Sequence, residues 1–212
     1  MRADVFDYVA NCLVCQQLRP PATSGLLGDT PLVGRRFDTV HIDLASVDQT
    51  ATCSAKAFLI IVDSVTAMPV VMPLVDQTAA RVIEAFRVGW LTRFGTPRVV
   101  VADNGSQLVG EEMKSFARRH GMRMHFVQPY HQQANGLAER TIQTIKKALR
   151  ALAVLDPART GDWTRDVPAA VWSFVSATSA SRGISPFELA YGQKPVLSIC
   201  LLYTSPSPRD RG

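Results

Sequence analysis

The order of strand and helix patterns between residues 37 and 126 constrains the fold more than any other feature of this sequence. Three stretches with the spacing of strands come first, and only short connections separate them. Such short connections favour an antiparallel meander for these three strands. Two helix patterns follow, and each is followed in turn by another strand pattern. The order predicts an α/β fold.

The expected strands differ in which of their faces are apolar. Val40, Ile42 and Leu44 share one face of the first strand, while the polar His41 and Asp43 lie on the other, which is the pattern of a half-buried strand. The stretch 99–102 is β-branched and apolar on both faces, as in a buried central strand. The remaining strands are expected over about 58–62, 70–75 and 122–126.

Helical spacing of apolar residues predicts four helices, over about 79–94, 113–120, 136–154 and 163–178. Thr78 can serve as the N-cap of the first helix, and Gly95 lies just past its end. We expect the segment from Asp166 to Pro168 to mark a start or a kink in the last helix. The tryptophans at helical core positions are Trp90, Trp163 and Trp172.

Composition and charge narrow the class of protein. At 212 residues, with 47% hydrophobic and 19% charged residues, the chain can bury the core of one ordinary domain. The longest apolar run, residues 57–62, is far shorter than the roughly 18–20 residues of a membrane span, and residues 1–4 begin no signal peptide. We therefore expect a soluble intracellular protein. Its net charge of +5 favours an anionic partner such as nucleic acid.

Three carboxylates stand where catalytic groups are often found. Asp43 lies in the middle of a strand, Asp103 follows the apolar strand 99–102, and Glu139 lies in the first turn of the long helix. If the first strand is central and the helix packs beside it, the three side chains converge at one edge of the sheet. Oxygen ligands without an accompanying His or Cys select Mg²⁺ or Mn²⁺. A site with two such ions suits in-line phosphoryl transfer.

The long helix carries a polar stripe beside its apolar one. Glu139, Lys146 and Arg150 lie on this stripe at helical spacing, together with Gln143. A stripe of this kind can hold metal through the carboxylate at one end and contact DNA phosphates through the cations at the other. The alternative is a solvated charged face, which is the more common meaning of such a run.

The sequence resembles the integrases of retroviruses and gypsy-type long-terminal-repeat retrotransposons over residues 37–195. That family's core carries an Asp, a second Asp, then thirty-five residues and a Glu, and residues 104–138 between Asp103 and Glu139 number 35. The segments that look like its motifs are 41–44 (HIDL), 102–107 (ADNGSQ), 130–140 (YHQQANGLAER) and 185–192 (SPFELAYG). Four motifs in the correct order are specific where any one of them would be weak.

The resemblance implies a ribonuclease H-like fold with a five-stranded mixed sheet flanked by helices, over a catalytic core of residues 37–199. It implies DNA integration, in which two Mg²⁺ or Mn²⁺ ions held by Asp43, Asp103 and Glu139 support 3′-end processing and strand transfer. The expected partners are retroelement DNA ends, target DNA and further copies of the chain, with no membrane and no small-molecule substrate. The expected location is the nucleus or a cytoplasmic virus-like particle.

The same resemblance raises the case for DNA contacts along the polar stripe and in the loop before it. The expected contacts are Lys146, Lys147 and Arg150 from the helix, and Gln133 and Asn135 from the loop.

The two ends of the chain differ from the family pattern. Cys12 and Cys15 look like half of the family's zinc site, but no His precedes His41. We therefore expect residues 1–19 to be the remnant of a zinc-binding helical module, joined by a linker of residues 20–36; Zn²⁺ would bind only to the complete module. Residues from about 200 to 212 back-translate to DNA that resembles a sequencing adapter, which predicts an artefact rather than native chain.

Two other classes of function stay open. A ribonuclease H-type nuclease would use the same fold and carboxylates on an RNA–DNA hybrid, and an integrase relic would bind DNA without catalysis. Asp63 is the chief rival carboxylate, and we interpret it as structural. The histidines without metal-ligand partners at useful spacing are interpreted in the same way, namely His41, His120 and His125.

Overall fold

The computed structural model describes residues 34–46, 53–102, 108, 110–126, 136–155, 162–179 and 182–196. Within residues 136–155 it describes the side chains of residues 139–149. The expected zinc-module remnant, the linker up to residue 33 and the tail from residue 200 lie outside these ranges. No helix in the described part of the chain combines the length and the apolar character needed to cross a bilayer.

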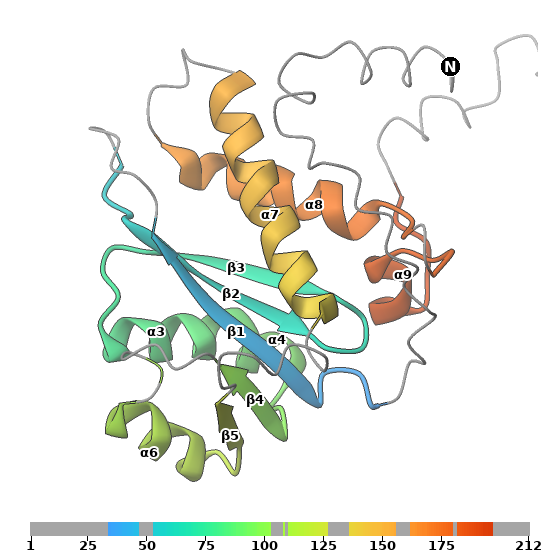
Figure 1. Ribbon diagram of the computed structural model, residues 1–212. Coiled ribbons are helices and arrows are strands. Elements are labelled where there is room, and N and C mark those ends of the chain that lie inside the picture. The colour runs from blue at the N-terminus through green and yellow to red at the C-terminus, as the bar shows by residue number, and fades with distance from the viewer. Residues whose placement is uncertain are drawn as a thin grey trace, which may run out of the picture.

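The core of the fold is one five-stranded mixed sheet, as predicted (Figure 1). Its strands lie in the order β3-β2-β1-β4-β5, so that β1 is central. β1 pairs antiparallel with β2, and β2 pairs antiparallel with β3, which confirms the meander; β4 pairs parallel with both β1 and β5. The strands are β1 (Thr39–Ser46), β2 (Ala57–Asp63), β3 (Pro69–Leu74), β4 (Val99–Ala102) and β5 (Arg123–Phe126).

Helices cover both faces of this sheet. Figure 1 shows α7 and α8 on one side of the sheet, and α3, α4 and α6 on the other. The helical elements are α3 (Ala79–Phe86), η1 (Arg87–Leu91), α4 (Thr92–Phe94), α6 (Glu111–Arg119), α7 (Gly136–Leu155), η3 (Trp163–Asp166), α8 (Val167–Ser176) and α9 (Pro186–Tyr191).

Two apolar clusters fill the space between the sheet and these helices. Val40 and Ile42 on β1 belong to the cluster that includes α3 and α6, whereas Ile60 on β2 belongs to the cluster under α7 and α8. Ile60 is the register partner of Asp43. Because directly opposed residues of paired strands point to the same face of a sheet, Asp43 faces α7. The predicted alternation of β1 therefore places its carboxylate under the long helix.

The predicted helix 79–94 is interrupted. It begins at Ala79 as expected, but residues Arg87–Leu91 form a π-helical turn before the chain returns to α-helix at Thr92. Thr78 is the N-cap residue, yet its hydroxyl donates to Asp76 Oδ1 at 2.6 Å instead of capping the helix. Gly95 ends the segment with a φ of +83°, which glycine adopts without strain.

The predicted helix 163–178 is divided into η3 and α8 at the expected place near Asp166 and Pro168. Trp90 and Trp163 are buried, as predicted. The prediction for Trp172 was wrong, because its side chain is 41% exposed. The buried residues of α8 are Val167, Ala170 and Val175. Trp172 instead packs edge-to-face against Phe187 of α9, with the ring centroids 5.7 Å apart.

Candidate active site

Asp43 lies on the central strand, next to the point where β4 ends. Its neighbour Ile42 is paired with Ala102, the last residue of β4. Asp103 follows Ala102 in the sequence and lies outside the described residues. In open α/β sheets, ligands bind at the carboxyl ends of the parallel strands. The topology therefore places Asp43 beside a sheet edge of this kind.

Asp43 forms an ion pair with a side chain of the long helix. Lys146 Nζ donates to Asp43 Oδ2 at 2.9 Å, and the two side chains are 21% and 26% exposed, respectively. The helix is held at this position because Ile142, Ile145 and Leu149 pack into the apolar cluster that contains Ile60. The apolar stripe of α7 thus fixes its polar stripe above β1.

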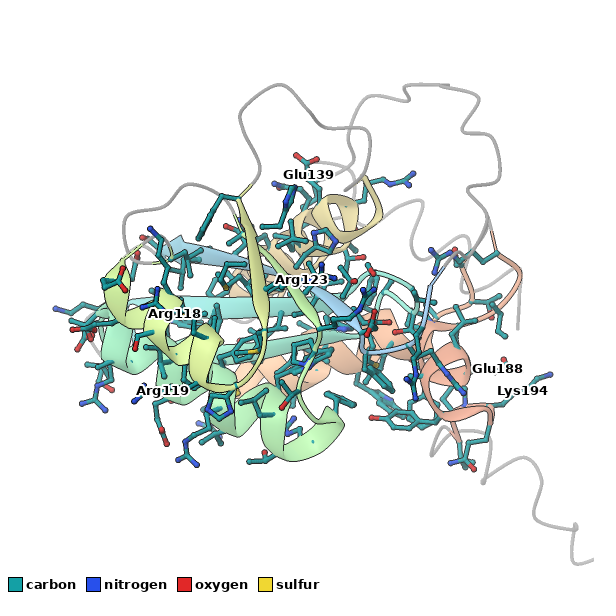
Figure 2. The ribbon with its side chains drawn as sticks, turned by 90° about the horizontal axis from the view of Figure 1, so that it is seen from below. Arg118, Arg119, Arg123, Glu139, Glu188 and Lys194 are labelled. Atoms are coloured by element: carbon teal, nitrogen blue, oxygen red, sulfur yellow. The ribbon has the colours of Figure 1, made fainter. Side chains whose placement is uncertain are left out.

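Glu139 lies in the first turn of the same helix, before Lys146. It is exposed, and Figure 2 shows its side chain at the end of α7, directed away from the body of the protein. It precedes Lys146 by seven residues, which corresponds to about 10 Å along an α-helix. Among the described residues, which do not include Asp103, no three His, Cys, Asp or Glu side chains are grouped to hold a metal ion. The convergence of the three carboxylates therefore stays a prediction.

Asp43 offers an oxygen donor of the kind that a hard divalent cation binds. Its carboxylate is partly buried, and its partner among the described side chains is the Lys146 ammonium. Divalent cations of this type take carboxylate oxygens as ligands. Asp103 and Glu139 would complete such an oxygen donor set.

The expected DNA contacts are only partly described. Lys146 is directed to Asp43, and Lys147 is exposed on the next position of α7. The structure does not describe Gln133, Asn135 or the side chain of Arg150, and it does not describe Cys12 or Cys15 of the expected partial zinc site. The roles expected for those residues stay predictions.

A further cation near the start of α7 was missed by the sequence analysis. Arg182 Nη1 donates to the backbone oxygen of Val65 at 2.8 Å. Burial lowers the pKa of Arg182, as does the charge of Arg140, while Asp63 opposes the shift. The charge of Arg140, in the early part of α7, therefore acts on Arg182 from a helix remote in sequence. No periodic pattern surrounds Arg182, and the sequence therefore carried no signal for its position.

Asp63 has a structural environment, in agreement with the interpretation from sequence. It is fully buried, and its carboxylate accepts hydrogen bonds from the Phe37 N–H at 2.8 Å and from the Thr66 N–H and Oγ1 at 2.7 Å each. Two of these three bonds come from the turn that directly follows β2. The carboxylate is therefore satisfied by its own local structure.

His41 is also buried, on the same face of β1 as Asp43. Burial lowers its pKa to about 4, with a smaller contribution from the charge of His125. The imidazole is therefore neutral at pH 7, which agrees with a structural residue.

Residues 35–132 match the family model described as the integrase core domain. Transposon Tf2-3 polyprotein of Schizosaccharomyces pombe is 27% identical over 201 residues, which cover 93% of this chain and 15% of that polyprotein. Transposon Tf2-4 polyprotein of the same organism matches to the same extent. The chain thus spans about one seventh of the length of these relatives.

Solved structures share the fold. The HTLV-2 integrase catalytic core domain, solved in complex with magnesium in a trimeric form, superposes with a TM-score of 0.59 at 18% identity, over 73% of this chain and 97% of that one. The catalytic core domain of BIV integrase superposes with a TM-score of 0.59 at 17% identity, over 79% of this chain and 99% of that one. A simian T-cell lymphotropic virus intasome, solved in complex with a PP2A regulatory subunit, superposes with a TM-score of 0.64 at 15% identity, over 93% of this chain and 69% of that one. These likenesses confirm the expected ribonuclease H-like fold.

Proposed function

Because residues 35–132 match the model of the integrase core domain, we propose that this chain is the catalytic segment of a retroelement integrase. The observation that carries the proposal is the position of Asp43. Asp43 lies on the central strand, beside the end of β4. The residue that follows β4 in the sequence is Asp103, the second carboxylate of the motif. The spacing from Asp103 to Glu139 supplies the third.

The proposed reaction is DNA integration by polynucleotidyl transfer, with 3′-end processing followed by strand transfer. Asp43, Asp103 and Glu139 would hold two Mg²⁺ or Mn²⁺ ions, which supply activation of the attacking oxygen and stabilisation of the leaving oxygen. In processing, a water oxygen bonds to phosphorus and the 3′ oxygen of the element's DNA leaves. In strand transfer, that 3′ hydroxyl attacks a target phosphodiester. Both steps exchange one P–O bond for another, and no covalent enzyme intermediate is needed.

The chain's own side chains would position the DNA. Lys147 is exposed on α7 and can contact phosphates, and Lys146 and Arg150 share the polar stripe. Gln133 and Asn135 would contact the DNA end from the preceding loop. We propose retroelement DNA ends, target DNA and further copies of this chain as partners, in the nucleus or in a cytoplasmic virus-like particle. The full protein would extend beyond this segment, as the longer relatives do.

The direct test is Mn²⁺-dependent cleavage and joining of labelled DNA by the full chain. Asp43→Asn, Asp103→Asn and Glu139→Gln are expected to abolish both activities and to leave the circular dichroism spectrum unchanged. Glu112→Gln is the matched control, since Glu112 is an exposed acid in the first turn of α6. Metal-dependent activity that survives Asp103→Asn or Glu139→Gln would contradict the proposal. An RNA–DNA hybrid in the same assay distinguishes the ribonuclease H alternative.

A further inference from the structure

The ion pair between Lys146 and Asp43 largely buries both partners, whereas in Arg98–Asp38, which also joins remote positions, the arginine side chain is 61% exposed. Lys146 and Asp43 are 103 positions apart in the sequence, and both side chains are about three-quarters buried. In the pairs Arg87–Glu84 and Arg118–Glu111, by contrast, each side chain is more than half exposed and its partner is close in sequence. The Lys146 pair therefore joins the long helix to the central strand in a partly desolvated place.

A carboxylate in such a place needs a counter-charge. Burial penalises an unpaired charge strongly, and removing one partner of a buried pair leaves that penalty uncompensated. Asp43 projects from the middle of a strand whose face is covered by the apolar cluster under α7. The Lys146 ammonium supplies the compensating charge at 2.9 Å.

A divalent cation bound to Asp43 would need the same carboxylate. An ammonium and a metal ion repel each other, so the two cannot both lie against one carboxylate without loss of binding free energy. Lysine is suited to such an exchange, because its charge sits at the end of a flexible stem and makes no bidentate fork with the carboxylate.

We propose that Lys146 is the built-in counterion of Asp43 before metal binds, and that a divalent cation displaces its ammonium from this carboxylate. The inference rests on the proposed metal site at Asp43. It assigns Lys146 a positioning role that precedes any contact with DNA: the lysine keeps the Asp43 carboxylate oriented toward α7 until the cation replaces it. The displaced ammonium stays on the polar stripe of α7, where it is available to a phosphate.

The test is Mn²⁺ binding by the full chain without DNA, measured as the loss of the free-ion signal in electron paramagnetic resonance. Lys146→Met removes the competing charge and is expected to tighten Mn²⁺ binding by about threefold to tenfold. Lys147→Met is the matched control, because it removes the same charge from the adjacent, exposed position of the same helix. It is expected to leave the affinity within about twofold of the original chain. Lys146→Arg keeps a positive charge opposite Asp43 and is expected to stay close to the original affinity.

Asp43→Asn separates failure of this inference from failure of the proposed site. If Asp43→Asn binds as much Mn²⁺ as the original chain, or if neither binds any, the metal site and the inference both fail. If Mn²⁺ binds through Asp43 but Lys146→Met and Lys147→Met have equal affinities, the site stands and the competition is refuted. A weaker affinity in Lys146→Met would also refute it. Thermal unfolding followed by circular dichroism verifies that each variant is folded. If Lys146→Met does not fold, Lys146→Gln replaces it, with the same expected tightening of Mn²⁺ binding.

Discussion

Asp43 and Asp63 show how partners distinguish two carboxylates on neighbouring strands. Asp63 ends β2 and accepts three hydrogen bonds from neutral donors, two of them in the turn that follows it. Asp43 instead meets a single cation from a remote helix. The three neutral donors tie Asp63 into the fold, whereas the displacement of Lys146 that we propose would leave Asp43 available for a ligand.

Asp63→Asn is expected to lower the free energy of unfolding by about 2 kcal/mol, because an amide has one acceptor oxygen for three donors that are buried or partly buried. One of those donors, Phe37, has a φ of +64°, so the bond also holds an unfavourable backbone conformation. Asp76→Asn is the matched control, since Asp76 accepts the same kind of bonds from Thr78 in an exposed place. Urea unfolding measures both. Equal losses in the two variants would contradict the buried role of Asp63.

His41 is expected to make stability depend on pH. Its pKa is about 4 in the folded chain, below the usual value of 6.5 for an unfolded chain. Above pH 6.5 both states are neutral and the group contributes nothing. As the pH falls from 6.5 to 4, the unfolded state takes up the proton first, which lowers stability by up to about 3 kcal/mol. Urea unfolding at several pH values should show this loss reduced in His41→Gln and retained in His120→Gln, where the imidazole is exposed.

At the scale of elements, the segment from α3 to α4 shows how packing modifies a regular pattern. Its apolar periodicity is helical throughout, yet residues Arg87–Leu91 form a π-helical turn. Gly89 lies in this turn and closely approaches β3, where a Cβ added to it would lie 2.7 Å from Met72 Cγ and 2.9 Å from its Sδ. The close approach of helix to sheet depends on the missing side chain.

Gly89→Ala is therefore expected to destabilise the protein by about 1–3 kcal/mol through overpacking, although alanine is the better helix former by about 1 kcal/mol. The measurement is the free energy of unfolding. Adding Met72→Ala should recover part of the loss, because it opens the space that the new methyl group needs. A Gly89→Ala variant that is more stable than the original chain would show that propensity, rather than this contact, decides the position.

At the scale of the whole molecule, one side chain joins the two ends of the described fold. Arg36 Nη1 donates to the backbone oxygens of Leu189 and Ala190, at 3.1 and 3.2 Å, across more than 150 positions of sequence. These carbonyls belong to the last turn of α9, where cations also interact favourably with the helix dipole. The turn before β1 and the last described helix are thus held together.

Arg36→Ala is expected to speed hydrogen exchange of the amides in residues 186–192 by about threefold to tenfold, with less change in β1 and β2. The matched control is Arg93→Ala, which removes an exposed arginine in α4. If the amides of residues 186–192 exchange at the same rate in the original chain, Arg36→Ala and Arg93→Ala, Arg36 does not hold α9.

The sequence by itself determined the five strands, the positions of four main helical segments, the order of these elements, the meander and the spacing of the carboxylate motif, but not α9. These properties lie within short windows, since periods of 2 and 3.6 residues and the terminal glycines act locally. Only the tertiary structure decided that Lys146 meets Asp43, that Trp172 is exposed, that Arg182 lies near Arg140 and that a π-turn forms at Gly89. Each of these depends on which surfaces pack together, and the free energy of packing belongs to residues remote in sequence.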